Sequence, residues 1–279
     1  MDDLVQQVKR YLLSKGISVT FDWEEMLEQE HDFNFTVAKM TELDMLTDTQ
    51  LLVTQAITEG MTYQQFASLL KPMLIKKGWW GKQVMVDPWS DEEREVQLGS
   101  DKRIRTIYET NMRTARAYGQ YQRTLRTSQT LPYYVYELGP SRVHRKEHLK
   151  WAGLMLPVDD PFWETHYPPN GWGCKCRLRQ VSQWEYERLQ RDGLTERMQE
   201  LDESGMPTGR FTTETVAVKT TAPPIDMQQY VNKRTGEVSF VPEGIDPGWA
   251  YHPKYRRQAL DKEMAQKEAA YDQAARGNQ

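Results

Sequence analysis

The chain has only two cysteines among its 279 residues, Cys174 and Cys176, and one position separates them. A bridge between them would close a small, strained ring, so no disulfide framework is expected and both thiols should be reduced. The sequence also lacks an apolar N-terminal leader and any apolar run long enough to span a membrane. We therefore expect an unanchored protein that stays in the compartment where it is made.

The sequence has no excess of positive charge and little apolar mass. Its net charge is −4 and its isoelectric point is near 5.8, which argues against a dedicated DNA-binding protein. Mean hydropathy is −0.77 and the hydrophobic fraction is 38%, both low for a compact enzyme. Nine Trp, 14 Tyr and seven Phe still supply enough aromatic mass for a core. These values predict a folded but thin or elongated body with a large exposed surface.

The first hundred residues have the periodicity of helices. Apolar residues recur at helical spacing between Leu43 and Ile57, and Gly60 follows where a C-terminal cap would stand. Thr62 and Gln65 form a capping box that opens the next helix, and the run Gly-Trp-Trp-Gly at 78–81 predicts a rigid corner.

A long helix is predicted at 102–126, where basic residues outnumber acidic ones. Such a face is either simply solvated or turned toward DNA phosphates or an acidic partner. The candidates for such contacts are Arg113, Arg116 and Arg123.

From residue 131 onward the sequence predicts strands. Segments 131–138 and 174–181 are expected to lie in one small mixed sheet, with a short helix capped by Ser141 between them. Ser182 and Glu185 predict the start of another helix, residues 230–241 a hairpin, and the Ala-rich tail after Lys254 a C-terminal helix. The predicted class is α+β: a helical N-terminal region (1–100), a core (101–200), and an extension with a β-hairpin and a helix (201–279).

The densest chemistry lies in residues 145–177. This stretch holds both cysteines together with His148 and His166, and thiolate and imidazole groups are the ligands that suit zinc. A structural zinc held by Cys174, Cys176 and His148, with His166 or His144 as the fourth ligand, would order a loop of about twenty residues that has little apolar mass of its own. The alternative is that the cysteines are small buried apolar residues and His148 is a hydrogen-bonded core residue.

His144 and His148 also form H-x-x-E-H with Glu147, the zinc motif of inverted metalloproteases. The basic residues around it indicate a solvated helix rather than the buried helix of a peptidase. No phosphate-binding loop and no Gly-x-Ser-x-Gly nucleophile signature occur, so no catalytic residue is predicted.

The same stretch carries a longer pattern: R-x-E-H, a following Gly, D-P-x-W and P-P-N-G-W-G-C-x-C. It is formed here by Arg145, Glu147, His148, Gly153, Asp160, Pro161, Trp163, residues 168–174 and Cys176. FTVAKM at 35–40 and IYETNMRTARAYGQYQR at 107–123 add matches in the same order. Together, from about residue 22 to 181, they resemble the head-morphogenesis domain of tailed phages named after the F protein of phage Mu.

The resemblance implies a noncatalytic minor capsid protein that acts in head morphogenesis and DNA packaging. Its implied partners are the portal and other procapsid components, with packaged double-stranded DNA as a further contact. It would be found in the host cytoplasm during assembly and then in the virion head. The alternative is a metal-dependent or nucleotide-modifying, toxin-like enzyme carried on such a domain.

Overall fold

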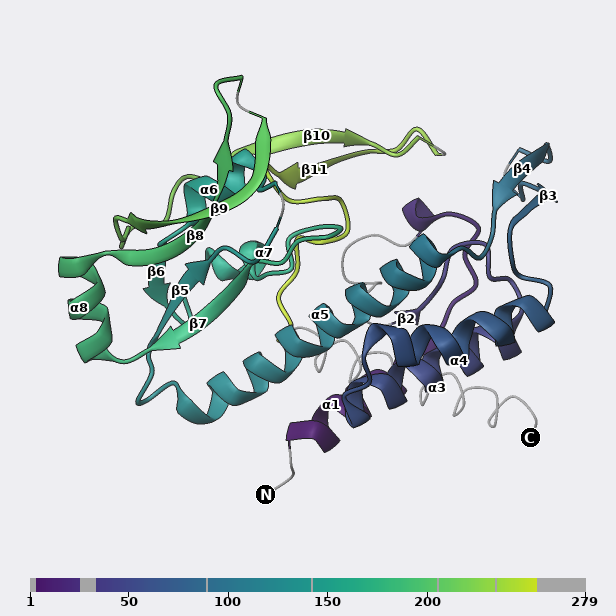
Figure 1. Ribbon diagram of the computed structural model, residues 1–279, viewed down its shortest axis with the longest axis horizontal. Helices are drawn as coiled ribbons and strands as arrows, with labels where there is room; N and C mark the ends of the chain where they lie inside the picture. The colour runs from purple at the N-terminus through teal and green to yellow at the C-terminus, as the bar shows by residue number, and fades with distance from the viewer. Residues whose placement is uncertain are drawn as a thin grey trace, which may run out of the picture.

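The computed structural model describes residues 4–25, 34–88, 90–141, 143–204, 206–233 and 235–254. A helical part and a part built of small sheets lie at opposite ends of the molecule, and the long helix α5 (Asp101–Thr127) runs from one to the other (Figure 1). The predicted α+β class is confirmed. The predicted C-terminal helix falls outside the described residues.

The helical part contains α1 (Leu4–Leu13), α3 (Leu43–Glu59) and α4 (Tyr63–Lys76). The predicted capping signals are confirmed: Gly60 adopts the left-handed conformation, and Thr62 and Gln65 form the capping box. A short 3-10 helix at Trp23–Glu25 and a parallel pair of two-residue strands, β1 (Gly16–Ile17) and β2 (Asn34–Phe35), complete this part.

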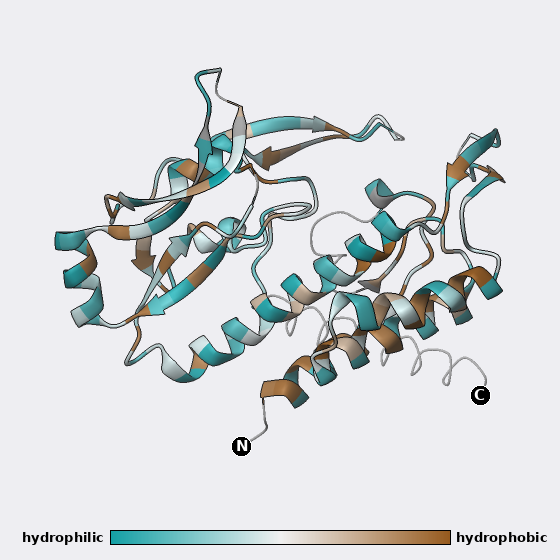
Figure 2. Cartoon of the chain, viewed as in Figure 1, coloured by the Kyte–Doolittle hydropathy of each residue, from teal (hydrophilic) through white to brown (hydrophobic). Residues whose placement is uncertain are grey.

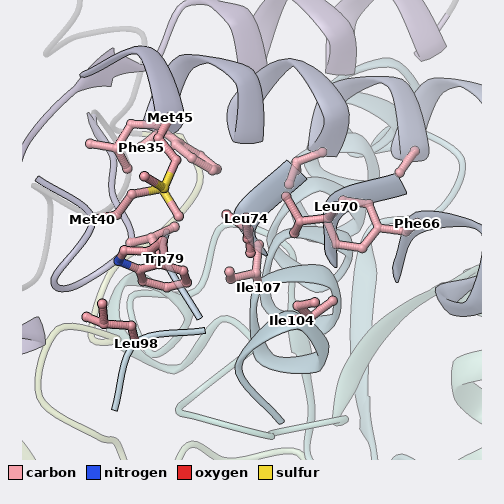
Figure 3. Close-up of a cluster of buried hydrophobic side chains, with 14 of the residues drawn as sticks. Phe35, Met40, Met45, Phe66, Leu70, Leu74, Trp79, Leu98, Ile104 and Ile107 are labelled. Atoms are coloured by element: carbon pink, nitrogen blue, oxygen red, sulfur yellow. The ribbon is translucent and has the colours of Figure 1, made fainter. Parts of the chain in front are cut away.

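Side chains from α3, α4, α5 and the segments around β2 and β4 form one apolar cluster (Figure 3), while the buried side chains of α1 pack separately against Ala115 of α5. Phe66, Leu70 and Leu74 of α4 are fully buried against Ile104 of α5, while Met40, Met45 and Trp79 close its other end. The indole of Trp79 donates a hydrogen bond of 2.7 Å to the carbonyl oxygen of Lys39. The Trp-Trp corner is therefore a packing element of the helical part.

The helical prediction for the first hundred residues misses a hairpin. β3 (Lys82–Val86) and β4 (Glu93–Gln97) pair antiparallel, with Lys82 opposite Gln97. The strands carry charged residues between β-branched ones, so the apolar periodicity of a buried strand is weak. Cross-strand charge supports the pairing, because Lys82 Nζ lies 2.6 Å from a carboxylate oxygen of Glu95.

The second part is built around a three-stranded sheet in the order β6–β5–β7, which comprises β6 (Met155–Pro157), β5 (Tyr133–Glu137) and β7 (Arg177–Val181). The prediction that the two longer strands share one sheet is confirmed. Both pairings are antiparallel rather than mixed, since β5 lies between two strands that run opposite to it. β6 was not predicted because three residues carry too little periodicity.

Short helices surround this sheet: α6 (Lys146–Trp151), α7 (Trp163–His166) and α8 (Gln183–Asp192). Ser182 caps α8 as predicted, but α6 begins at Lys146, so the expected helix from Ser141 is wrong. Two hairpins follow, β8 (Leu194–Leu201) with β9 (Pro207–Val216), and β10 (Met227–Val231) with β11 (Val238–Pro242). The second hairpin was predicted.

Hydrophilic residues dominate α8 and much of α5, while hydrophobic residues gather on α3 and α4 (Figure 2). Among the described residues, no helix combines the length and the apolar character needed to cross a membrane.

Candidate metal centre

Three of the predicted ligands come together beside the three-stranded sheet. His148 lies on α6, Cys174 in the loop before β7, and Cys176 directly before β7 begins. All three are buried, and their ligand atoms lie within 4.8 Å of one another. Nδ1 of His148 is 3.8 Å from Sγ of Cys174 and 3.5 Å from Sγ of Cys176.

These distances suit a tetrahedral metal ion. Zinc bound at about 2.3 Å from sulfur and about 2.05 Å from nitrogen places the two ligand atoms roughly 3.6 Å apart in a tetrahedron. The two observed separations bracket that value. A neutral imidazole and two thiolates also balance the charge of a divalent cation, which lowers the cost of burying it. The three side chains therefore fit zinc in both geometry and charge.

The second nitrogen of His148 fixes the tautomer that binding requires. Nε2 lies 2.9 Å from the carbonyl oxygen of Gly244, which can only accept a hydrogen bond. The proton therefore sits on Nε2, and the lone pair of Nδ1 is directed at the two sulfurs. A metal-bound histidine typically makes this kind of outer contact, because it orients the ring and raises its basicity.

The loop that carries the cysteines is shaped by its prolines and glycines. The Pro168–Pro169 peptide is cis, and Gly173 has a φ of +75° that other residues rarely adopt. A Cβ added at Gly139, after β5, would lie 1.8 Å from the carbonyl oxygen of Lys175. Only glycine at 139 lets the strand end pass so close to the chain between the two cysteines.

The buried surroundings of the sulfurs are aromatic and polar. The Tyr136 hydroxyl donates a 3.0 Å hydrogen bond to Oδ1 of Asn170, and the ring of Trp151 stacks on His148 at 5.0 Å. Burial and the two cysteines hold the pKa of Tyr136 well above its usual value, so it stays protonated. A hydrogen bond from Cys176 lowers the pKa of Cys174, and the same contact raises that of Cys176.

An ion pair holds the segment after β11 against this site. Arg145, at the start of α6, makes two hydrogen bonds of 2.7 Å to the carboxylate of Asp246. The same carboxylate accepts a 2.8 Å hydrogen bond from the backbone N–H of Trp172. These contacts therefore join α6, the cysteine loop and the segment that carries Gly244. Asp246 was not predicted, since one acid in an extended segment gives no signal in sequence.

The other predicted ligand, His166, lies outside the group that the structure brings together. Its ring stacks on Phe162 at 3.9 Å, and Nδ1 lies 2.8 Å from the Thr165 hydroxyl. Burial lowers the pKa of His166 to about 4, so it is neutral at pH 7. Among the described residues, the metal-ligating group therefore comprises His148 and the two cysteines.

The H-x-x-E-H interpretation is contradicted by the bounds of α6. His144 precedes the helix, and its Nε2 lies 2.8 Å from the carbonyl oxygen of Gly139 instead of facing the sulfurs. The two histidines of the motif therefore do not share a helical face. Glu147 is half-buried on α6, and its side chain packs beside Gly244.

The three predicted arginines of α5 have different environments. Arg113 is half-buried and pairs with Glu109 at 2.5 Å, so the expectation that few acids offset these charges is wrong for this residue. Arg116 and Arg123 are exposed, and both line a groove between α1, α5 and β7.

Comparison with known proteins confirms the resemblance. Residues 47–179 match the family model described as Phage Mu protein F like protein. The chain is 42% identical over 172 residues to the protein of Escherichia phage Mu named as capsid assembly protein F. This alignment covers 62% of this chain and 39% of that protein. It is 38% identical over 169 residues to the Mu-like prophage FluMu F protein of Haemophilus influenzae, covering 60% and 39%. This chain thus spans 39% of each of these relatives. No solved structure matches it.

Proposed function

We propose that this chain, through its Mu F-like region at residues 47–179, acts as a noncatalytic minor head protein in the assembly of a tailed-phage head. The observation that carries the proposal is the 42% identity over 172 residues to the phage Mu protein named for capsid assembly. We extend it to association with the portal, to a part in DNA packaging, and to a location in the host cytoplasm and then the virion head. The three-region division of the chain remains a prediction.

The second element of the proposal is a structural zinc ion held by His148, Cys174 and Cys176. Support comes from the donor set, the separations of the ligand atoms and the contact from His148 Nε2 to Gly244. The ion would link α6, the cysteine loop and the segment after β11, and would add folding free energy to a site that is already packed with buried aromatic side chains. A fourth ligand is not assigned, and His166 would have to move to supply it.

A noncatalytic role is favoured because all three ligands are buried, with Trp151 stacked on His148 and Gly244 in contact with its ring. A catalytic zinc keeps an open position for water and substrate, whereas a structural one is enclosed by protein. The competing proposal, an enzyme carried on the same domain, requires a reactive group within reach of substrate.

The test is genetic complementation in the phage or prophage that encodes the chain. Deleting the gene should abolish infectious particles, and electron microscopy should show absent, misshapen or empty heads. Supplying the full chain in trans should restore both particle yield and DNA content. Cross-linking mass spectrometry on assembling heads should place the chain next to the portal. Normal heads and titre after deletion would refute the proposed function.

A further inference from the structure

The groove between α1, α5 and β7 has a volume of about 540 Å³ and a distinctive lining. Much of its floor is apolar, with Leu4 and Val8 from α1, Ile57 from α3 and Met112 from α5. Among the described residues, four arginines and no carboxylate belong to this lining; they are Arg116, Arg123, Arg177 and Arg179. A groove lined by apolar side chains and arginines is suited to a ligand that carries both apolar and acidic groups.

The arginines on the helix wall are available to a ligand. Arg116 and Arg123 are seven positions apart, about two helical turns, so they point to the same side of α5. Both are exposed, and neither forms an ion pair with any residue that the structure describes. On β7, Arg177 pairs with Glu137 yet keeps 64% of its side chain exposed, while Arg179 pairs with both Glu137 and Glu185.

Direct contacts between α1, α5 and β7 hold the groove in place. At Gly119 an added Cβ would lie 3.3 Å from the Val8 side chain, so α1 and α5 approach closely there. The side-chain amide of Gln120 donates to the carbonyl oxygen of Leu178, which fixes α5 against β7. A ligand would enter a groove that is already formed, which lowers the entropic cost of binding.

We propose that this groove binds an acidic polypeptide segment of a partner protein, with carboxylates on the arginines and apolar side chains on the floor. Duplex DNA fits less well, because protein–DNA interfaces are more polar and more positively charged than this floor. The net charge of −4 also opposes a duplex at long range. The inference deepens the proposed function and rests on it, since the partner is sought among the proteins that build the head.

The experiment uses the full chain and three fluorescent probes: a peptide alternating Glu and Leu, its Lys and Leu counterpart, and a short DNA duplex. Binding is measured by fluorescence anisotropy with the double variant Arg116→Glu/Arg123→Glu. The matched control is Lys102→Glu/Arg126→Glu, which changes the net charge equally on the same helix but outside the groove. Melting temperatures of both variants check that they fold.

The groove variant should bind the Glu peptide about tenfold more weakly and should gain affinity for the Lys peptide, while the control stays within about twofold of wild type. Equal losses in both variants, or no binding of the Glu peptide to the wild type, would overturn the proposal. Tighter binding of the duplex, lost in the groove variant, would assign the groove to nucleic acid instead. Binding detected only after Asp2→Asn/Asp3→Asn would assign it to the chain's own N-terminus.

The groove proposal and the proposed function in head assembly can fail independently of each other. If peptide binding follows the groove but gene deletion leaves heads normal, the head-assembly role fails and the groove stands. If deletion abolishes heads and the groove variant still complements fully, the head-assembly role stands and the groove proposal fails.

Discussion

Replacing Cys174 and Cys176 with serine tests the candidate metal centre against its simplest alternative, a pair of buried apolar thiols. The double change keeps the side-chain volume nearly constant but removes both soft ligands, which leaves His148 as one imidazole facing two hydroxyls. If a metal is bound, its whole contribution to folding is lost. If none is bound, the change costs only the burial of two hydroxyl groups.

The magnitude follows from linkage. A metal present at roughly a thousand times its dissociation constant stabilises the folded chain by about 4 kcal/mol. For domains of roughly 150–250 residues, 1 kcal/mol shifts the melting temperature by about 2–4 °C, so loss of the metal should lower it by about 8–16 °C. Two buried hydroxyls also reduce the free energy of unfolding, by roughly 1–3 kcal/mol for each one left without a partner. The drop alone therefore does not separate the two interpretations.

The discriminating quantity is the effect of a chelator on each protein. Because all three ligands are buried, the chelator must be present through a cycle of unfolding and refolding. Differential scanning calorimetry should then show a large drop for the wild type and almost no change for the double serine variant. Elemental analysis of untreated wild type should find close to one zinc per chain. A metal-free wild type that folds and melts normally with or without chelator would refute the reasoning.

Three further predictions concern single side chains. Burial raises the pKa of Glu196 to about 7, above its unfolded value of 4.5, so the free energy of unfolding should fall as pH rises through this window. Glu196→Gln should therefore melt at a higher temperature than wild type at pH 8 but not at pH 4. Calorimetry in the presence of chelator compares the two proteins. An equal difference in melting temperature at the two pH values would contradict the proposed titration of Glu196. Gly139→Ala should destabilise the fold by roughly 1–3 kcal/mol and lower the zinc content, because its methyl group meets the Lys175 carbonyl; unchanged denaturant midpoint and metal content would exclude that contact. Glu147→Gln should leave particle yield intact in the complementation assay, and loss of particles from a normally folded variant would revive the enzyme alternative.

Several elements were predictable because their signals are local. The cap at Gly60, the capping box at Thr62, the helix start at Ser182 and the long helix α5 depend on residues within one or two turns. The hairpin β10–β11 follows from its turn residues in the same way. Three weakly patterned elements were missed: the charged hairpin β3–β4, the three-residue strand β6 and the hairpin β8–β9.

The candidate metal centre was likewise predictable in part, because some of its features are local in the sequence and others are not. Ligand types and the short Cys-x-Cys spacing are local, so His148, Cys174 and Cys176 were identifiable from the sequence. His166 is equally near in sequence, yet ring stacking on Phe162 holds it outside the group.

What the amino-acid order could not reveal are the contacts made across long separations. Gly244 supplies the carbonyl that sets the His148 tautomer, and Asp246 clamps Arg145, although each pair is about a hundred positions apart. The basic helix likewise carries seemingly equivalent arginines, and only packing against α1 and β7 separates the two that line the groove from Arg113, which Glu109 neutralises. The physical reason is that periodicity and capping report the energetics of neighbouring residues, whereas the partner of a buried polar group is chosen by how the whole chain closes around it.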